Sequence, residues 1–146
     1  MGEGGFGSVF LAHDSEAGAL CALKIFKLMP LEKIEREIAL TQSFDHHALL
    51  HGIAGKALTG VLREGDNTLS KSESYLATEL ATNGDLYQFL SLGKVFPERI
   101  AQAIFVQLLD ALEYMHMRGF VHLDIKPENV FIDCEYCAKL GDFGLA

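Results

Sequence analysis

The chain has 146 residues, of which 49% are hydrophobic and 22% charged, and its formal net charge at pH 7 is −8. This length and composition predict one globular domain with a hydrophobic core and exclude a disordered chain. The acidic balance argues against a nucleic-acid partner, because no basic patch outweighs it, and no apolar run approaches the roughly 20 residues of a membrane span. The start of the chain lacks the basic and apolar regions of a secretory signal.

The sequence contains three cysteines, at positions 21, 134 and 137. A low, odd count without a secretory signal predicts reduced thiols and a cytoplasmic or nuclear location. Cys134 and Cys137 have the spacing of a zinc-ligand pair, but the sequence offers no second Cys or His pair at a matching spacing. We therefore predict a turn between two strands at this point.

A glycine-rich segment, Gly-Glu-Gly-Gly-Phe-Gly-Ser-Val, occupies residues 2–9. The same glycine spacing occurs in dinucleotide-binding folds, where a helix follows the glycines. Here a β-branched and aromatic run follows at residues 8–13, which is typical of a strand. The segment therefore predicts a hairpin whose glycines let the backbone approach phosphate groups. A flexible glycine-rich start is the plainer alternative.

The next predicted strand, residues 20–26, places Ala22 and Lys24 on one face, because side chains two positions apart point the same way. The small Ala22 leaves room for a flat ring such as adenine. Lys24 beside it has the length and the charge to reach a phosphate. A single lysine on a strand is usually only solvated, so this interpretation depends on a partner for the lysine.

The partner is expected on a helix that begins after Pro30 and runs from residue 31 to about 44. Its apolar side chains recur on one stripe, which predicts that this stripe packs on the sheet. Glu37 is the candidate ion-pair partner of the lysine. Glu32 and Glu35 are competitors that the spacing alone does not exclude.

Beyond this helix, residues 53–74 show no clear periodicity, and residues 63–74 form a polar insertion typical of a loop. A strand is predicted at 75–80, and a short helix at 83–90, capped by an Asn or Asp. A long, broadly apolar helix is predicted at 97–118, ended by a glycine. The order of elements predicts an α+β fold.

Residues 120–129, Phe-Val-His-Leu-Asp-Ile-Lys-Pro-Glu-Asn, concentrate the polar chemistry of the chain. Asp124, Lys126 and Asn129 supply a carboxylate, an ammonium and a carboxamide around one proline. Together these groups can take a proton from a hydroxyl, steady a phosphate and hold a divalent metal. A two-strand hairpin at 130–140 then leads into Asp142-Phe-Gly. Each aspartate taken alone is also an ordinary turn residue.

The chain resembles the eukaryotic protein kinases over essentially its whole length. The glycine-rich segment, Ala-x-Lys, His-x-Asp-x-Lys-x-x-Asn and Asp-Phe-Gly are specific in combination. The resemblance implies a two-lobed protein-kinase-like fold, with an antiparallel β N-lobe and one helix in residues 1–80 and a partial, mainly helical C-lobe in 81–146. It also implies ATP and Mg²⁺ as cofactors, and phosphoryl transfer to Ser or Thr hydroxyls of a protein substrate.

The resemblance further implies a set of nucleotide-binding residues. These are Gly2, Gly4, Gly5, Phe6, Gly7, Val9, Ala22, Lys24, Thr78, Glu79, Ala81, Asp85 and Phe131. Lys24 would bind the α- and β-phosphates and pair with Glu37, which the family's helix-to-loop spacing favours. Thr78 would guard the back of the pocket. Asp85 would reach the ribose, although it is equally well explained as a helix cap.

For the chemistry itself, the resemblance implies that Asp124 accepts the proton of the substrate hydroxyl and that Lys126 contacts the transferred phosphate. A lysine at that position is similar to Ser/Thr kinases rather than Tyr kinases. Asn129 and Asp142 would hold Mg²⁺.

The sequence departs from the family pattern at three positions. Leu123 stands where many kinases have an Arg that pairs with a phosphate on the activation segment, so we expect no activation by that route. Thr41 and Gly52 fall where the family places apolar side chains that stack with His122 and Phe143. A weak stack would leave the helix at 31–44 mobile. A leucine at 123 is similar to Wee/Myt-type kinases and Lys-Pro-Glu-Asn to calmodulin-dependent kinases, so the subfamily stays open.

The chain starts at the glycine-rich segment and stops just after Asp-Phe-Gly, at about half the length of a kinase domain. We therefore expect a fragment that forms the nucleotide cleft, exposes part of the 97–118 helix and is a poor catalyst alone. A non-catalytic, kinase-like (pseudokinase) module that binds ATP and regulates a partner is the alternative. A dinucleotide-dependent oxidoreductase is a third hypothesis, which a hairpin at residues 2–9 would exclude.

Overall fold

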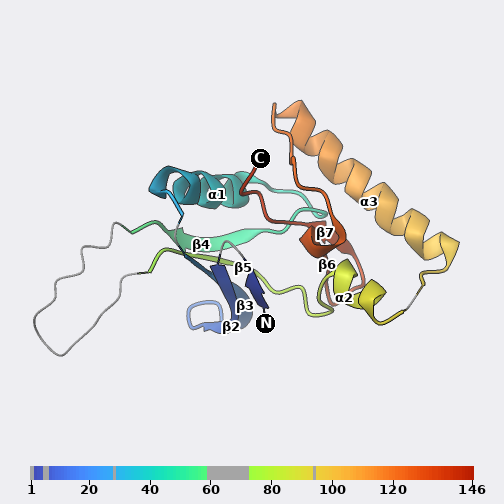
Figure 1. The fold of residues 1–146 in the computed structure, drawn as a ribbon, viewed down its shortest axis with the longest axis horizontal. Helices are drawn as coiled ribbons and strands as arrows, with labels where there is room; N and C mark the ends of the chain where they lie inside the picture. Colours follow the sequence, from blue (N-terminus) through green and yellow to red (C-terminus); the bar gives the residue numbers. More distant parts are fainter. Residues whose placement is uncertain (1, 5–6, 28, 59–72, 94) are drawn as a thin grey trace, which may run out of the picture.

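A computed structural model of the chain describes residues 2–4, 7–27, 29–58, 73–93 and 95–146. Gly5, Phe6 and most of the predicted polar insertion lie outside these residues. The described chain forms a lobe built on a β-sheet and a mainly helical lobe, joined by the segment that follows β5 (Figure 1). This arrangement confirms the predicted two-lobed α+β fold.

The first lobe contains one antiparallel five-stranded sheet in the order β1-β2-β3-β5-β4. Its strands are β1 (Gly2–Gly4), β2 (Gly7–Asp14), β3 (Ala19–Phe26), β4 (Gly52–Lys56) and β5 (Tyr75–Glu79). The strands predicted at 8–13, 20–26 and 75–80 are confirmed to within one residue at each end. The sequence did not predict β4, because two glycines interrupt it and its side chains do not alternate in hydrophobicity.

Helix α1 (Leu31–Ser43) lies along β4, as Figure 1 shows, and confirms the helix predicted at 31–44. Its buried Ile34 and Ile38 pack with apolar side chains of the sheet. The glycines of β4 explain how closely α1 approaches. A Cβ at Gly55 would lie 2.7 Å from Ile38 Cγ2, and one at Gly52 would lie 3.0 Å from the backbone of α1. The residues that weaken the strand pattern therefore make room for the helix.

The second lobe contains two α-helices, a short 3₁₀ helix and a two-stranded hairpin. These elements are α2 (Leu86–Ser91), α3 (Glu98–Met117), η1 (Pro127–Asn129), β6 (Val130–Ile132) and β7 (Ala138–Leu140). The predicted helices and hairpin are confirmed, and only η1 was not predicted. Gly119 has a φ of 80°, so it provides the left-handed residue that follows the long helix.

The main hydrophobic core joins the lobes, because Phe44 and Leu49, which follow α1, pack with Met115 of α3 and with Phe143. The opposite side of α3 is exposed, as predicted. Its exposed apolar side chains include Phe105, Val106 and Leu109, at 62%, 64% and 52% exposure. In the described part of the chain, no helix has both the length and the apolarity to cross a membrane.

Candidate active site

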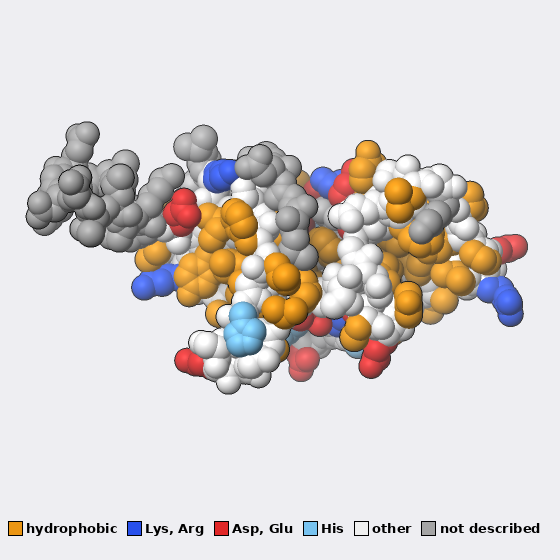
Figure 2. Space-filling model, turned by 90° about the horizontal axis from the view of Figure 1, so that it is seen from below, with side chains coloured by type: hydrophobic (Ala, Val, Ile, Leu, Met, Phe, Trp, Pro, Cys, Tyr) orange, Lys and Arg blue, Asp and Glu red, His pale blue; other side chains and the backbone are white. Residues whose placement is uncertain are grey.

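A cleft of about 470 Å³ lies between the two lobes. Figure 2 shows the furrow on one face of the molecule. Most of the predicted site residues line it: Gly7, Val9, Ala22, Lys24, Glu37, Thr78, Glu79, Ala81, Asp85, Asn129, Phe131 and Asp142. The fold therefore brings together residues that are up to 135 positions apart in the chain, from Gly7 to Asp142.

The glycine-rich segment forms the predicted hairpin. Gly2 pairs with Val9 and Gly4 with Gly7 across β1 and β2. A Cβ at Gly7 would lie 2.2 Å from the carbonyl oxygen of Ile25, so only glycine allows this approach of β2 to β3. The hairpin excludes the dinucleotide-binding alternative, which requires a helix directly after the glycines.

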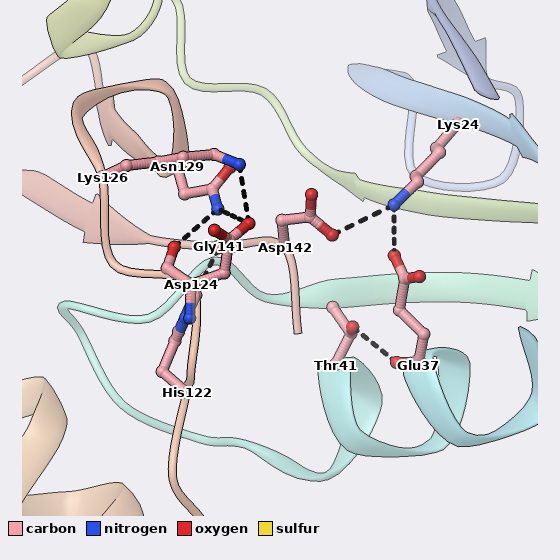
Figure 3. A network of polar contacts seen from close by, with 9 residues as sticks. All are labelled: Lys24, Glu37, Thr41, His122, Asp124, Lys126, Asn129, Gly141 and Asp142. Carbon is pink, nitrogen blue, oxygen red and sulfur yellow. Dashed lines mark hydrogen bonds and ion pairs between the residues drawn. The ribbon is translucent and has the colours of Figure 1, made fainter. Parts of the chain in front are cut away.

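Lys24 of β3 meets two carboxylates from different parts of the chain (Figure 3). Its Nζ lies 2.5 Å from Glu37 Oε1 on α1 and 3.2 Å from Asp142 Oδ1 beyond β7. The competitors Glu32 and Glu35 are exposed, whereas the Glu37 side chain is 2% exposed. The structure therefore identifies Glu37 as the partner and links the sheet, α1 and the second lobe through one ammonium group.

Burial shifts the pKa values of both Lys24 and Glu37. Burial on its own lowers the pKa of Lys24, but the charges of Asp142 and Glu37 outweigh it and raise that pKa above its usual value. Burial raises the pKa of Glu37, and the charge of Lys24 only partly offsets this. Glu37 Oε2 is buried without a hydrogen-bond partner among the described residues. Lys24 is therefore held as a cation, while Glu37 depends on it for compensation.

The loop before η1 holds the second polar group. Asp124 Oδ2 accepts hydrogen bonds from Lys126 Nζ at 2.7 Å and from Asn129 Nδ2 at 2.9 Å. Asn129 Nδ2 also donates to the backbone oxygen of Asp124 at 2.8 Å. The hydrogen bond from Lys126 is the main cause that lowers the pKa of Asp124, so its carboxyl group is ionised near neutral pH.

His122 fixes this loop against the strand that carries Asp142. The imidazole is fully buried, with Nε2 3.0 Å from the carbonyl oxygen of Gly141, while Nδ1 accepts from the backbone N–H of Asp124 at 3.3 Å. Burial lowers the pKa of His122, which favours the neutral imidazole with its proton on Nε2. Leu123, which follows His122, and Asp142, which follows Gly141, both have a φ of 62°. This left-handed conformation is uncommon for residues other than glycine.

Phe143 is packed by a residue that the sequence did not suggest. Its ring lies 5.0 Å from that of Phe44 and 5.5 Å from that of His122, both edge to face. Thr41 instead donates its hydroxyl to the carbonyl oxygen of Glu37 at 2.7 Å. Thr41 therefore provides no apolar stack, as predicted, but Phe44 covers Phe143. The predicted mobility of α1 stays a prediction.

The segment that joins the lobes gives a mixed result for two predicted residues. Glu79 lines the cleft, but its carboxylate accepts from the backbone N–H of His51 at 2.8 Å and pairs with Lys139 Nζ at 3.1 Å. Asp85 accepts from Gln88 N and Gln88 Nε2, both at 2.7 Å, and so caps α2. The structure thus shows the helix-cap role of Asp85, and its ribose contact stays a prediction.

Several residues that line the cleft were not predicted. They are Leu50, Leu80, Gly84, Gln88 and Glu128. Leu80 directly follows β5, and Leu50 lies two residues before β4, a strand that the sequence did not predict. Glu128 lies between Pro127 and Asn129 of the polar loop, and its residue type alone gave no reason to assign it to the site.

The Lys24–Glu37 pair, Asn129 and Asp142 line one cleft between two lobes, and Asp124 and Lys126 lie in the loop that carries Asn129. This arrangement is typical of the protein kinase class. Comparisons with known proteins agree. A family model described as "Protein kinase domain" matches residues 1–146. The chain therefore belongs to the protein kinase family.

Similar proteins come from plants and fungi. CBL-interacting protein kinase 21 of Oryza sativa subsp. japonica is 34% identical over 152 aligned positions, which cover 100% of this chain and 27% of that protein. CBL-interacting protein kinase 4 of the same plant is 34% identical, with 100% and 32% covered. The Aurora kinase of Schizosaccharomyces pombe is 32% identical, with 99% and 39% covered. The chain thus spans between about a quarter and two fifths of the length of these relatives.

Proposed function

We propose that this chain forms the ATP-binding and catalytic cleft of a serine/threonine protein kinase. The observation that carries the proposal is the contact of Lys24 with both Glu37 and Asp142, which brings the phosphate-binding lysine and a metal-binding carboxylate together across the lobes. Asp124 and Asn129 lie beside each other in the second lobe, and Asp142 lies between them and Lys24 (Figure 3). In phosphoryl transfer, catalysis depends mainly on such positioning and on charge.

The lining of the cleft fits a nucleotide. Ala22 and Thr78 are opposite each other on β3 and β5, so small side chains flank the back of the cleft, where a flat base fits. Phe131 supplies an apolar wall from the second lobe, and Gly7 leaves the roof without side-chain bulk. Lys24 adds the positive charge that phosphates require.

The donor set also fits Mg²⁺, which prefers oxygen ligands. Asn129 Nδ2 donates hydrogen bonds to Asp124. Among the described residues, the amide oxygen of Asn129 has no such partner, so it can act as a ligand. Asp142 contributes a carboxylate on the other side. When bound at Asn129 and Asp142, Mg²⁺ would neutralise the negative charge of the phosphates.

The substrate hydroxyl would lose its proton to Asp124. Oδ2 of this carboxylate already accepts hydrogen bonds from Lys126 and Asn129. Oδ1 accepts none from the described residues, so it is the oxygen that a substrate hydroxyl would reach. The lowered pKa of Asp124 keeps it ionised, and the two hydrogen bonds hold it in one orientation. Lys126 supports Ser or Thr rather than Tyr as the acceptor, through the family resemblance.

Nucleotide binding tests the first half of the proposal. Addition of MgATP at about 100 times its Kd should stabilise the chain by about 2.7 kcal/mol in a thermal-shift assay. Lys24→Ala and Asp142→Ala should lose this shift, whereas Lys56→Ala, which removes an exposed lysine from β4, should keep it. If the wild-type chain shows no shift, ATP is not its ligand.

Transfer of labelled phosphate to a mixture of Ser- and Tyr-containing peptides tests the second half. We expect weak labelling of the Ser peptides by this chain, and the exposed apolar side of α3 also favours aggregation during the assay. ATP binding with no labelling at all, in a chain that also regulates a partner, would favour the non-catalytic alternative. Rates near the ~1–100 s⁻¹ typical of kinases would contradict the expectation of a weak catalyst.

A further inference from the structure

Three metal-ligand side chains meet on the surface away from the cleft. His46 and His47 lie in the segment between α1 and β4, and Asp110 lies on α3. Oδ2 of Asp110 is 3.4 Å from His46 Nε2 and 3.5 Å from His47 Nε2. All three ligand atoms lie within 4.8 Å of one another. Two elements that are far apart in sequence therefore direct two imidazoles at the same carboxylate oxygen.

The contacts of Asp110 Oδ2 with the two imidazoles are longer than strong hydrogen bonds and leave room for a shared ion. An N–H···O hydrogen bond usually measures about 2.7–3.2 Å between heavy atoms, and both contacts exceed this range. Zinc binds nitrogen and oxygen at about 2.0–2.2 Å, so two ligands of one tetrahedral zinc are about 3.3–3.5 Å apart. The two nitrogen–oxygen distances fall in this range, and the third pair of ligand atoms lies within 4.8 Å.

We propose that His46, His47 and Asp110 form a binding site for a first-row transition metal ion, with Zn²⁺ as the best match and water as the fourth ligand. Two imidazoles and one carboxylate suit Zn²⁺, Cu²⁺ or Ni²⁺ and not Mg²⁺, which requires oxygen ligands. The proposed site is therefore chemically distinct from the Mg²⁺ site in the cleft. It does not depend on the proposed kinase activity.

The surroundings of His46 both support the site and define what must move. Its ring packs against Tyr114, with ring centroids 4.8 Å apart, and its side chain is 13% exposed, so its position is fixed. However, His46 Nδ1 accepts from the backbone N–H of Ala48 at 3.2 Å. A histidine that binds metal through Nε2 carries its proton on Nδ1. Metal binding therefore releases the Ala48 contact, which gives the site a local signature.

Binding at this site would couple two parts of the fold. The segment that holds His46 and His47 directly follows α1, the helix that carries Glu37, while Asp110 belongs to the second lobe. An ion shared between them would fasten the end of α1 to α3. We therefore expect Zn²⁺ to raise the thermal stability of the chain through contacts that ATP does not touch.

The test is Zn²⁺ binding, measured by competition with a chromogenic chelator, on the full chain with Cys134→Ser and Cys137→Ser. These two changes remove exposed or partly exposed thiols that bind Zn²⁺ on their own. We expect one ion per chain. Its affinity should fall more than tenfold in His47→Ala and in Asp110→Asn, since each change removes a ligand. The matched controls His116→Ala and Glu113→Gln, at exposed positions of α3, should leave it unchanged.

Two results would overturn the proposal. One is Zn²⁺ affinity in the chain with Cys134→Ser and Cys137→Ser that is the same with and without His47, which is 65% exposed and whose removal leaves the core intact. The other is an unchanged amide NMR signal of Ala48 on saturation with Zn²⁺. Circular dichroism of each variant establishes that it is folded, so loss of binding is not mistaken for unfolding. Co²⁺ substitution adds a check, because a nitrogen and oxygen site lacks the charge-transfer absorption of a thiolate site.

Discussion

The two charged pairs of the cleft differ in their exposure to solvent. In the Lys24–Glu37 pair the side chains are 18% and 2% exposed, whereas in the Lys126–Asp124 pair they are 43% and 28% exposed. A buried charge that loses its partner is strongly destabilising, while an exposed pair contributes little to stability. The first pair therefore supports the fold as well as the site, whereas the second would serve mainly to orient the carboxylate that we propose as the base.

The contrast suggests a division of roles: the Lys24–Glu37 pair contributes to stability, and the Lys126–Asp124 pair to the proposed chemistry. Glu37 is buried with one unpartnered oxygen, so its environment requires the ammonium of Lys24. Asp124 is partly exposed, and one of its oxygens accepts from both Lys126 and Asn129. Substitutions in the two pairs should therefore fail in different ways.

The largest effect is expected from Asp124→Asn. The variant should lose about 10²–10⁴-fold in phosphoryl transfer, because the amide cannot accept the proton of the hydroxyl. Its free energy of unfolding should stay within about 0.5 kcal/mol of wild type, since the pair it breaks is solvated. Peptide labelling and urea unfolding measure the two quantities. Retained transfer would show that Asp124 is not the base.

Lys24→Met should also lower the free energy of unfolding, in addition to the loss of ATP binding expected when this lysine is removed. It leaves the buried Glu37 carboxylate uncompensated, which costs about 3–5 kcal/mol of folding free energy. Adding Glu37→Gln to this variant should restore part of the loss, because no buried charge remains. Urea unfolding of the two variants measures this, with Lys56→Met as the control for removal of a lysine from the sheet. Equal stability of Lys24→Met and Lys56→Met would remove the contrast between the pairs.

The sequence predicted the chemical residues of the cleft better than their supports. Lys24, Asp124, Asn129 and Asp142 were predicted because phosphate chemistry requires particular groups at particular spacings, and the structure brings all four to one region. Their roles in that chemistry stay predictions. The choice of Glu37 over its neighbours needed the helix phase, which only the packed structure gives: Glu32 and Glu35 face solvent.

The supports were missed where tertiary packing overrides local pattern. Strand β4 contains glycines because α1 approaches it closely, so its sequence lacks the alternation of a strand. Phe44 lies just beyond α1 and contacts Phe143 nearly 100 positions later, a pairing that no local period indicates. His46, His47 and Asp110 are likewise joined only by the fold.

A smaller effect on the free energy of unfolding is expected when the pH is varied around the pKa of His122. Burial lowers the pKa of His122, so in the folded chain it binds a proton less readily than in the unfolded chain. The unfolded state therefore holds more protons below the ordinary histidine pKa of about 6.5, and the free energy of unfolding should fall as pH drops through that value. His46, whose pKa burial also lowers, acts in the same direction.

His122→Gln should flatten this pH dependence while it keeps a donor for the Gly141 carbonyl. The slope of unfolding free energy between about pH 5 and 7 measures the change. His13→Gln, at an exposed position of β2, is the control and should leave the slope as in wild type. An unchanged slope in His122→Gln would show that this imidazole is protonated equally in both states.

The smallest effect is expected at Asp85, on the rim of the cleft, where the helix cap and the ribose contact make different demands. Asp85→Ala removes the cap of α2 and should cost about 1 kcal/mol, whereas Asp85→Asn keeps a capping oxygen and should cost little. If Asp85 is only a cap, the Asn variant binds ATP as tightly as wild type. Both carboxylate oxygens are already engaged by Gln88, so we expect this result. A clear loss of ATP affinity in Asp85→Asn, at unchanged stability, would instead assign Asp85 to the ribose and extend the chemical side of the cleft to the start of α2.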